Sequence, residues 1–224
     1  QIAFKESVIV IDPHTQLVDD ILSTIEDENK DNVVYIDITN HDFAFGFNIF
    51  SAKTEDQKAT LASDVSKSFS ESWISSGDRI QSVLMKTISA LVYSDKDASL
   101  LDMKRFLLEA DFRKSFLDSL DPILQYYFKH EFPLIKRHEL SPLILRIDNF
   151  LQTRLLQNIF IQRKGIDFEE LVAQRKLVLI NLGVGQIGFS NAQFIARIII
   201  NKVNQIALGR KNIHEQHPIR LICE

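Results

Sequence analysis

The sequence predicts an α/β fold in which a parallel β-sheet is interrupted by an all-α segment. Apolar runs at Val8–Ile11, Leu177–Leu182 and Ile219–Cys223 have the length of strands, and the first has no polar alternation. Such runs are typical of strands that are covered on both faces, as in parallel sheets. Strand character is absent for well over one hundred residues between them, where apolar residues recur at helical spacing.

The first βαβ unit is expected at residues 8–38. A helix over about 15–25 is indicated by apolar residues that recur at every fourth position from Leu17. A second strand over 33–36 ends at Asp37. Because βαβ crossovers are almost always right-handed and join parallel strands, these two strands belong to one parallel sheet.

Capping signals divide the middle of the chain into roughly six short helices. Ser99 with Asp102 forms an N-cap pair, and a capping residue stands before proline at Asp121-Pro122 and at Ser141-Pro142. We therefore expect an all-α insertion subdomain over residues 55–160.

Strand character returns at residue 177 and is followed by a glycine-rich segment, Gly183–Gly188. A long helix is expected from about Asn191 to Leu208, ended by Gly209. Residues 1–54 and 161–224 are thus expected to form one sheet-containing core.

Composition limits the classes of function. The 224 residues are 45% apolar and 25% charged, as in ordinary globular proteins, and the net charge of −4 does not favour nucleic-acid binding over the whole surface. Cys223 is the only cysteine, so a reducing, cytoplasmic location is expected. No apolar run reaches the roughly 18–20 residues of a membrane span. Because the chain starts at Gln1, we expect the natural N-terminus to lie upstream.

The glycine-rich segment matches two phosphate-binding motifs incompletely. Gly183, Gly185 and Gly188 fit G-x-G-x-x-G, but the strand-end acid of a dinucleotide site, expected about 20 residues later, is missing. Phe189 stands where a P-loop needs its lysine. A simple turn is favoured, and a dinucleotide-binding enzyme remains an alternative.

Two strand-end acids are the candidate functional residues. Asp12-Pro13-His14 follows the first strand, at the edge where open α/β sheets bind ligands, although the same residues also suit a turn. Glu224 follows the last apolar strand in a Walker B pattern, in which a carboxylate holds Mg²⁺. Many strands end in an acid, so each residue is a weak indication by itself.

The order of these features resembles the nucleotide-binding domain of conjugative and type IV secretion coupling proteins (TraG/TraD-like). These belong to the FtsK/HerA-type class of RecA-like DNA-pumping ATPases. The resemblance covers essentially the whole chain and rests on the following ordered segments: Val8–His14, Val33–Asp37, Gly46-Phe47-Asn48-Ile49, the helical insertion, Leu177–Gly188, Asn191–Arg210 and Pro218–Glu224.

The resemblance implies a RecA-like motor that couples ATP hydrolysis to DNA translocation and works as a hexamer with Mg²⁺. Asp12 and His14 would border the nucleotide, Asn181 would sense phosphate and Glu224 would help to hold the metal. DNA and secretion or relaxase proteins would be the partners, with any membrane association outside this chain.

Three departures from the family pattern are present. The Walker A loop is absent, Ile49 replaces the usual proline, and Glu224 stands at the usual aspartate position. We therefore expect the 224 residues alone to lack ATPase activity. A non-catalytic nucleic-acid- or protein-binding module is the main alternative.

Overall fold

The computed structural model describes residues 6–42, 45–73, 78–210 and 217–224. The chain divides into two compact units. Residues 1–45 and 166–224 form one unit, which we call the α/β unit, and residues 46–165 form the other, the helical unit.

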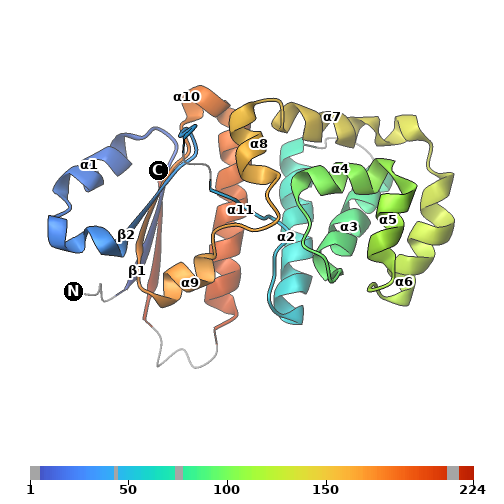
Figure 1. The fold of residues 1–224 in the computed structure, drawn as a ribbon, viewed down its shortest axis with the longest axis horizontal. Coiled ribbons are helices and arrows are strands. Elements are labelled where there is room, and N and C mark those ends of the chain that lie inside the picture. The colour runs from blue at the N-terminus through green and yellow to red at the C-terminus, as the bar shows by residue number, and fades with distance from the viewer. Residues whose placement is uncertain (1–5, 43–44, 74–77, 211–216) are drawn as a thin grey trace. The chain divides into compact units, whose positions relative to one another are not determined.

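The α/β unit contains one four-stranded, all-parallel sheet in the order β2-β3-β1-β4. The predicted α/β class, a parallel sheet interrupted by helices, is therefore confirmed (Figure 1). The elements of this unit are β1 (Ser7–Asp12), α1 (Gln16–Thr24), the 3-10 helix η1 (Asp27–Asn32), β2 (Val33–Asp37), α9 (Phe168–Ala173), β3 (Leu177–Asn181), α10 (Val184–Ile187), α11 (Phe189–Leu208) and β4 (Ile219–Cys223).

Helices cover both faces of this sheet. Alternation along the strands sends Val10 and Leu179 to one face, where they form a buried cluster with Val18 of α1. Ile9 and Ile11 point to the other face, the side on which α9 and α11 lie (Figure 1). This two-sided burial explains why β1 has no polar alternation.

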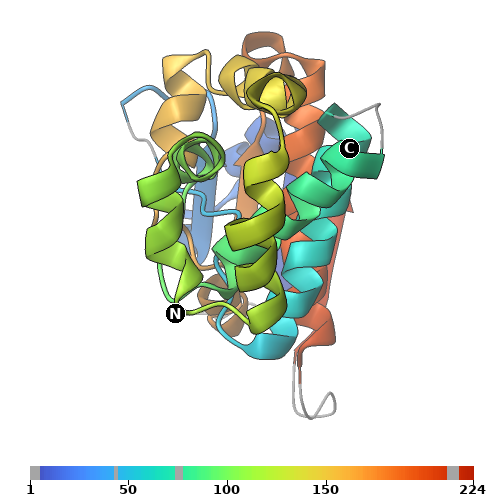
Figure 2. The same ribbon diagram turned by 90° about the vertical axis from the view of Figure 1, so that its right-hand side faces the viewer.

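The helical unit is built from α-helices and short 3-10 or π turns. Its elements are α2 (Glu55–Trp73), α3 (Asp78–Tyr93), α4 (Leu100–Leu108), α5 (Ala110–Leu117), α6 (Pro122–Tyr126), η2 (Tyr127–Glu131), η3 (Phe132–Leu134), η4 (Arg137–Leu140), α7 (Ser141–Phe150) and α8 (Arg154–Phe160). Helices α2 and α3 lie side by side (Figure 2). Buried aromatic rings fill the core, including an edge-to-face pair of Phe106 and Phe128 with ring centroids 4.9 Å apart.

Two of the three predicted helix starts are confirmed. Ser99 and Asp102 form a capping box at α4, and the Asp121 carboxylate accepts hydrogen bonds from two backbone N–H groups at α6. The prediction that Ser141 caps a helix was wrong. α7 begins at Ser141 itself, with Leu140 in the N-cap position, because η4 runs directly into α7.

Residues 46–54 and 161–165, which we predicted to belong to the sheet-containing core, cluster with the helical unit. The backbone N–H of Phe47 donates to the carbonyl oxygen of Ile159 over 3.0 Å, and the Asn48 side-chain amide donates to the carbonyl oxygen of Arg163. These contacts join the two ends of the insertion to each other. In the described part of the chain, no helix is long and apolar enough to cross a bilayer.

Candidate functional site

The polar residues that end the four strands form a row along the carboxyl edge of the sheet. Asp37 of β2 is in register with Asn181 of β3, and Asn181 is in register with Asp12 of β1. The backbone N–H of Glu224, just after β4, donates to the carbonyl oxygen of Ile11, so Glu224 lies beside Asp12. Parallel register thus brings together all four positions, which are as many as 212 residues apart in sequence (224 − 12).

Asp12 has no solvent-exposed surface, and its carboxylate holds the start of α1. Its Oδ1 accepts hydrogen bonds from the backbone N–H groups of His14 (2.6 Å) and Thr15 (2.9 Å), and its Oδ2 accepts one from Val18 (3.0 Å). Burial raises the pKa of Asp12, but these backbone hydrogen bonds outweigh burial, and the pKa lies below its usual value. Asp12 therefore fixes the turn that presents His14.

Glu224 is exposed, unlike Asp12, and directly follows β4. Two carboxyl groups at adjacent strand ends repel each other when both are ionised. A divalent cation bound at Glu224 would remove this repulsion. The described residues contain no group of three or more His, Cys, Asp or Glu side chains able to hold a metal. Phosphate oxygens and water would have to complete the coordination sphere.

Asn181 connects three loops at this edge and is only 3% exposed. Its Oδ1 accepts hydrogen bonds from the Thr15 hydroxyl (2.9 Å) and the Gly183 backbone N–H (3.0 Å). Its Nδ2 donates to Oδ1 of Asp37 over 3.2 Å. A movement of any one of these loops would therefore disturb the hydrogen bonds that Asn181 makes to the other two.

A pocket of about 480 Å³ opens at the same edge. It is lined by residues of β2 and β3 and of the segments that follow β1, β2 and β3, namely Pro13, His14, Thr15, Tyr35, Asp37, Thr39, Asn181, Gly183, Val184, Gly185 and Gln186. Of the four predicted site residues, His14 and Asn181 line this pocket, whereas Asp12 lies beneath the turn and Glu224 lies on the other side of Asp12.

Sequence reasoning did not select Tyr35, Asp37 or Thr39 as site residues. Asp37 ends a predicted parallel strand, so the signal that selected Asp12 could also have found it. Its Oδ1 accepts hydrogen bonds from the Thr39 backbone N–H (2.9 Å) and hydroxyl (2.7 Å). Burial, followed by the charge of Asp37, raises the pKa of Tyr35, so its hydroxyl stays protonated and able to donate a hydrogen bond at neutral pH.

The glycine-rich segment does not form a phosphate cradle. Residues 184–187 form the single-turn helix α10, and α11 begins at Phe189, two residues earlier than predicted. Most backbone N–H groups in the segment donate to protein oxygens, namely those of Gly183, Val184, Gln186, Ile187 and Gly188. Phosphate-binding loops depend on backbone N–H groups that are free to bind the anion. The geometry therefore favours the turn over the dinucleotide site.

The close approach of two loops requires glycine at position 183. Gly183 has φ +57°, and a Cβ there would overlap the Thr39 side chain. Replacing Gly183 with alanine is expected to destabilise the α/β unit by roughly 1–3 kcal/mol through backbone strain and this overlap. Gly185→Ala is the matched control, because a Cβ at position 185 meets no atom within 4 Å and α10 favours alanine. Urea unfolding of both variants measures the difference, and equal stabilities would contradict the prediction.

Comparison of the chain with protein-family models, with curated proteins and with solved structures finds no match.

Proposed function

We propose that this chain is part of a RecA-like motor ATPase that couples ATP hydrolysis to DNA translocation in conjugation or type IV secretion. Its cofactors would be ATP and Mg²⁺, and the complete protein would act in the cytoplasm as a hexamer. DNA and secretion or relaxase proteins would be its partners. The resemblance described above supplies these specific features.

The observation that supports nucleotide chemistry is the in-register row of Asp37, Asn181, Asp12 and Glu224 at the carboxyl edge. Open parallel sheets bind their ligands outside this edge. The row offers an amide at Asn181 and, on the far side of Asp12, a carboxylate for a metal at Glu224, and the loop after β1 adds His14. This combination suits a polyphosphate with its magnesium ion better than an uncharged ligand.

Each of the four predicted site residues has a specific role in this proposal. Glu224, exposed at the end of β4, would orient Mg²⁺. His14 would contact the nucleotide from the β1–α1 turn that Asp12 fixes. Asn181 would relay the state of the nucleotide, because its amide joins the loops after all three neighbouring strands. Asp12 is thus a positioning residue whose oxygens hold the backbone.

A motor of this kind needs a phosphate-binding loop from outside residues 1–224, because these residues contain no G-x-x-x-x-G-K-[ST] motif. The test is to read the coding sequence upstream of Gln1. We expect this motif within roughly twenty residues of Gln1. If the upstream sequence lacks this motif, the motor proposal is wrong and a non-catalytic binding module is favoured.

A further inference from the structure

A second pocket, of about 490 Å³, lies entirely within the helical unit. It is lined by Lys96, Asp97, Phe112, Ser115, Phe116, Arg163 and Lys164. Three cationic side chains therefore share one concave surface with two aromatic rings. None of these residues belongs to the carboxyl-edge site.

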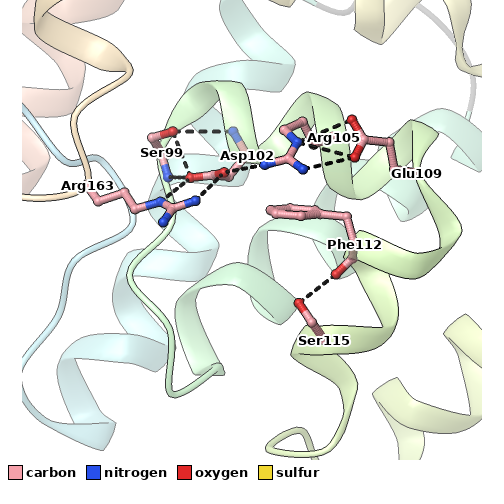
Figure 3. Close-up of polar contacts among 7 residues, drawn as sticks. All are labelled: Ser99, Asp102, Arg105, Glu109, Phe112, Ser115 and Arg163. Atoms are coloured by element: carbon pink, nitrogen blue, oxygen red, sulfur yellow. Dashed lines mark hydrogen bonds and ion pairs between the residues drawn. The ribbon is translucent and has the colours of Figure 1, made fainter.

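Arg163 is held in place by a buried carboxylate. Its Nε and Nη2 donate to the two oxygens of Asp102, each over 2.9 Å, as Figure 3 shows. The Asp102 side chain is only 5% exposed and is fixed in turn by the capping box with Ser99. The guanidinium is thus oriented before any ligand arrives, and an oriented donor loses little conformational entropy on binding.

Phe112 lines the same pocket and is half-buried, and its ring centroid lies 5.1 Å from that of Phe116, with the two rings tilted by 54°. The Arg105 guanidinium stacks on the Phe112 ring, 3.9 Å from its centroid, and Figure 3 places Phe112 between Arg105 and Ser115. Arg105 is itself fixed by hydrogen bonds to Glu109. A planar group that entered the pocket could pack against this pair of rings, as bases do on aromatic side chains.

The charge of the pocket favours an anion. Arg163 is paired with Asp102 and also feels the charge of Asp97. One net positive charge remains among Lys96, Asp97, Asp102, Arg163 and Lys164 (three cations and two acids). Lys96 lies over the Phe116 ring at 5.4 Å, a contact that keeps its ammonium at the pocket. Within the described chain, the ammonium of Lys164 has no hydrogen bond or ion pair in the structure.

We propose that this pocket binds a nucleotide unit, with its phosphate against Lys164, Lys96 and Arg163 and its base on Phe112. The unit could be a free nucleotide or one residue of a single DNA strand, since both carry the same phosphate and base. The inference does not depend on the motor proposed above, because it uses no residue of the carboxyl edge.

Calorimetric titration of the 224-residue chain with AMP, with inorganic phosphate and with a short oligothymidylate tests the proposal. Lys164→Ala is expected to weaken AMP binding by about tenfold, the effect of losing one charge-assisted hydrogen bond. Phe112→Leu should weaken AMP binding and leave phosphate binding unchanged. Asp97→Asn should tighten binding of both, because it removes the opposing charge.

A matched control separates an effect at this pocket from the general loss of a lysine. Lys129→Ala, which removes an exposed lysine bonded to Gln125 outside the pocket, should leave AMP binding unchanged. Thermal unfolding of each variant confirms that it is folded. If the wild type binds oligothymidylate and Lys164→Ala and Phe112→Leu weaken that binding, the ligand is a DNA strand. If the wild type binds AMP but not oligothymidylate, the ligand is a free nucleotide. No AMP or oligothymidylate binding, or AMP binding that Lys164→Ala and Phe112→Leu do not change, would overturn the proposal.

Discussion

Replacing Asp102 with alanine is expected to lower the free energy of unfolding of the helical unit by about 3 kcal/mol. The substitution removes the capping box at α4 together with the bidentate partner of Arg163. A helix cap contributes about 1 kcal/mol, and a hydrogen bond to a charged group about 1.5–3 kcal/mol. The buried backbone N–H of Ser99, which donates to Asp102 over 3.0 Å, would also lose its partner.

Acidic pH should remove the stabilisation that the Asp102 carboxylate provides, because the carboxylate becomes protonated. Burial raises the pKa of Asp102, but hydrogen bonds from Arg163 and Ser99 outweigh burial and hold the pKa below its usual value. Because the folded-state pKa is lowered, the contribution is complete above about pH 4 and is lost as the pH falls through the folded value. The unfolding free energies of the wild type and of Asp102→Ala should therefore converge in acid.

Urea unfolding followed by circular dichroism at several pH values measures this effect. Asp148→Ala is the control, because Asp148 is 43% exposed in its ion pair with Lys104 and should contribute less than about 1 kcal/mol. Equal losses in the two variants at neutral pH would show that the Asp102 network adds no more than a surface ion pair.

Asp12→Ala is expected to lower the free energy of unfolding of the α/β unit by about 3 kcal/mol. The substitution removes three hydrogen bonds from backbone N–H groups to the carboxylate at a fully buried position. The turn at His14 and the start of α1 should loosen first, because the N–H groups of His14, Thr15 and Val18 lose the carboxylate that accepts their hydrogen bonds. Hydrogen exchange of the amides of residues 14–18 measures this loosening directly.

Asp20→Ala, at an exposed position of α1, is the control for this measurement and should leave these amides protected. The Asp12 pKa is also lowered, so its stabilisation should likewise be complete above about pH 4 and fade below it. Protection at residues 14–18 that survives Asp12→Ala would show that the carboxylate is not the group that fixes the turn.

Local sequence patterns predicted the parts of the fold that depend on interactions between residues close together in the sequence. Continuous apolar runs marked the parallel strands, periodicity marked α1, and the Ser99–Asp102 pair marked the start of α4. Ser141 failed as a cap because the preceding turn, η4, is already helical, which depends on how residues 137–140 pack. The ends of the insertion also depend on long-range hydrogen bonds, such as that from Phe47 to Ile159, which no local pattern contains.

The part of the site that depends only on strand direction was predictable from the sequence. Parallel strands must bring Asp12 and Glu224 to one edge, and the structure places them side by side. The sequence could not show that both oxygens of Asp12 hold α1, because Asp-Pro-His fits a turn and a ligand site equally well. The register of β2 with β3, which no local pattern contains, brings Tyr35 and Thr39 beside the pocket residues that end and follow β3.

The central claim is that the carboxyl edge holds ATP and magnesium through Glu224. The most direct test is steady-state ATP turnover by the complete gene product that contains these residues, in the presence of DNA. Glu224→Gln should lower turnover on the order of 100-fold, because it removes the charge that orients Mg²⁺, while Glu28→Gln, exposed before β2, should not change it. Equal turnover in the two variants, or no turnover by the wild type, would contradict the claim.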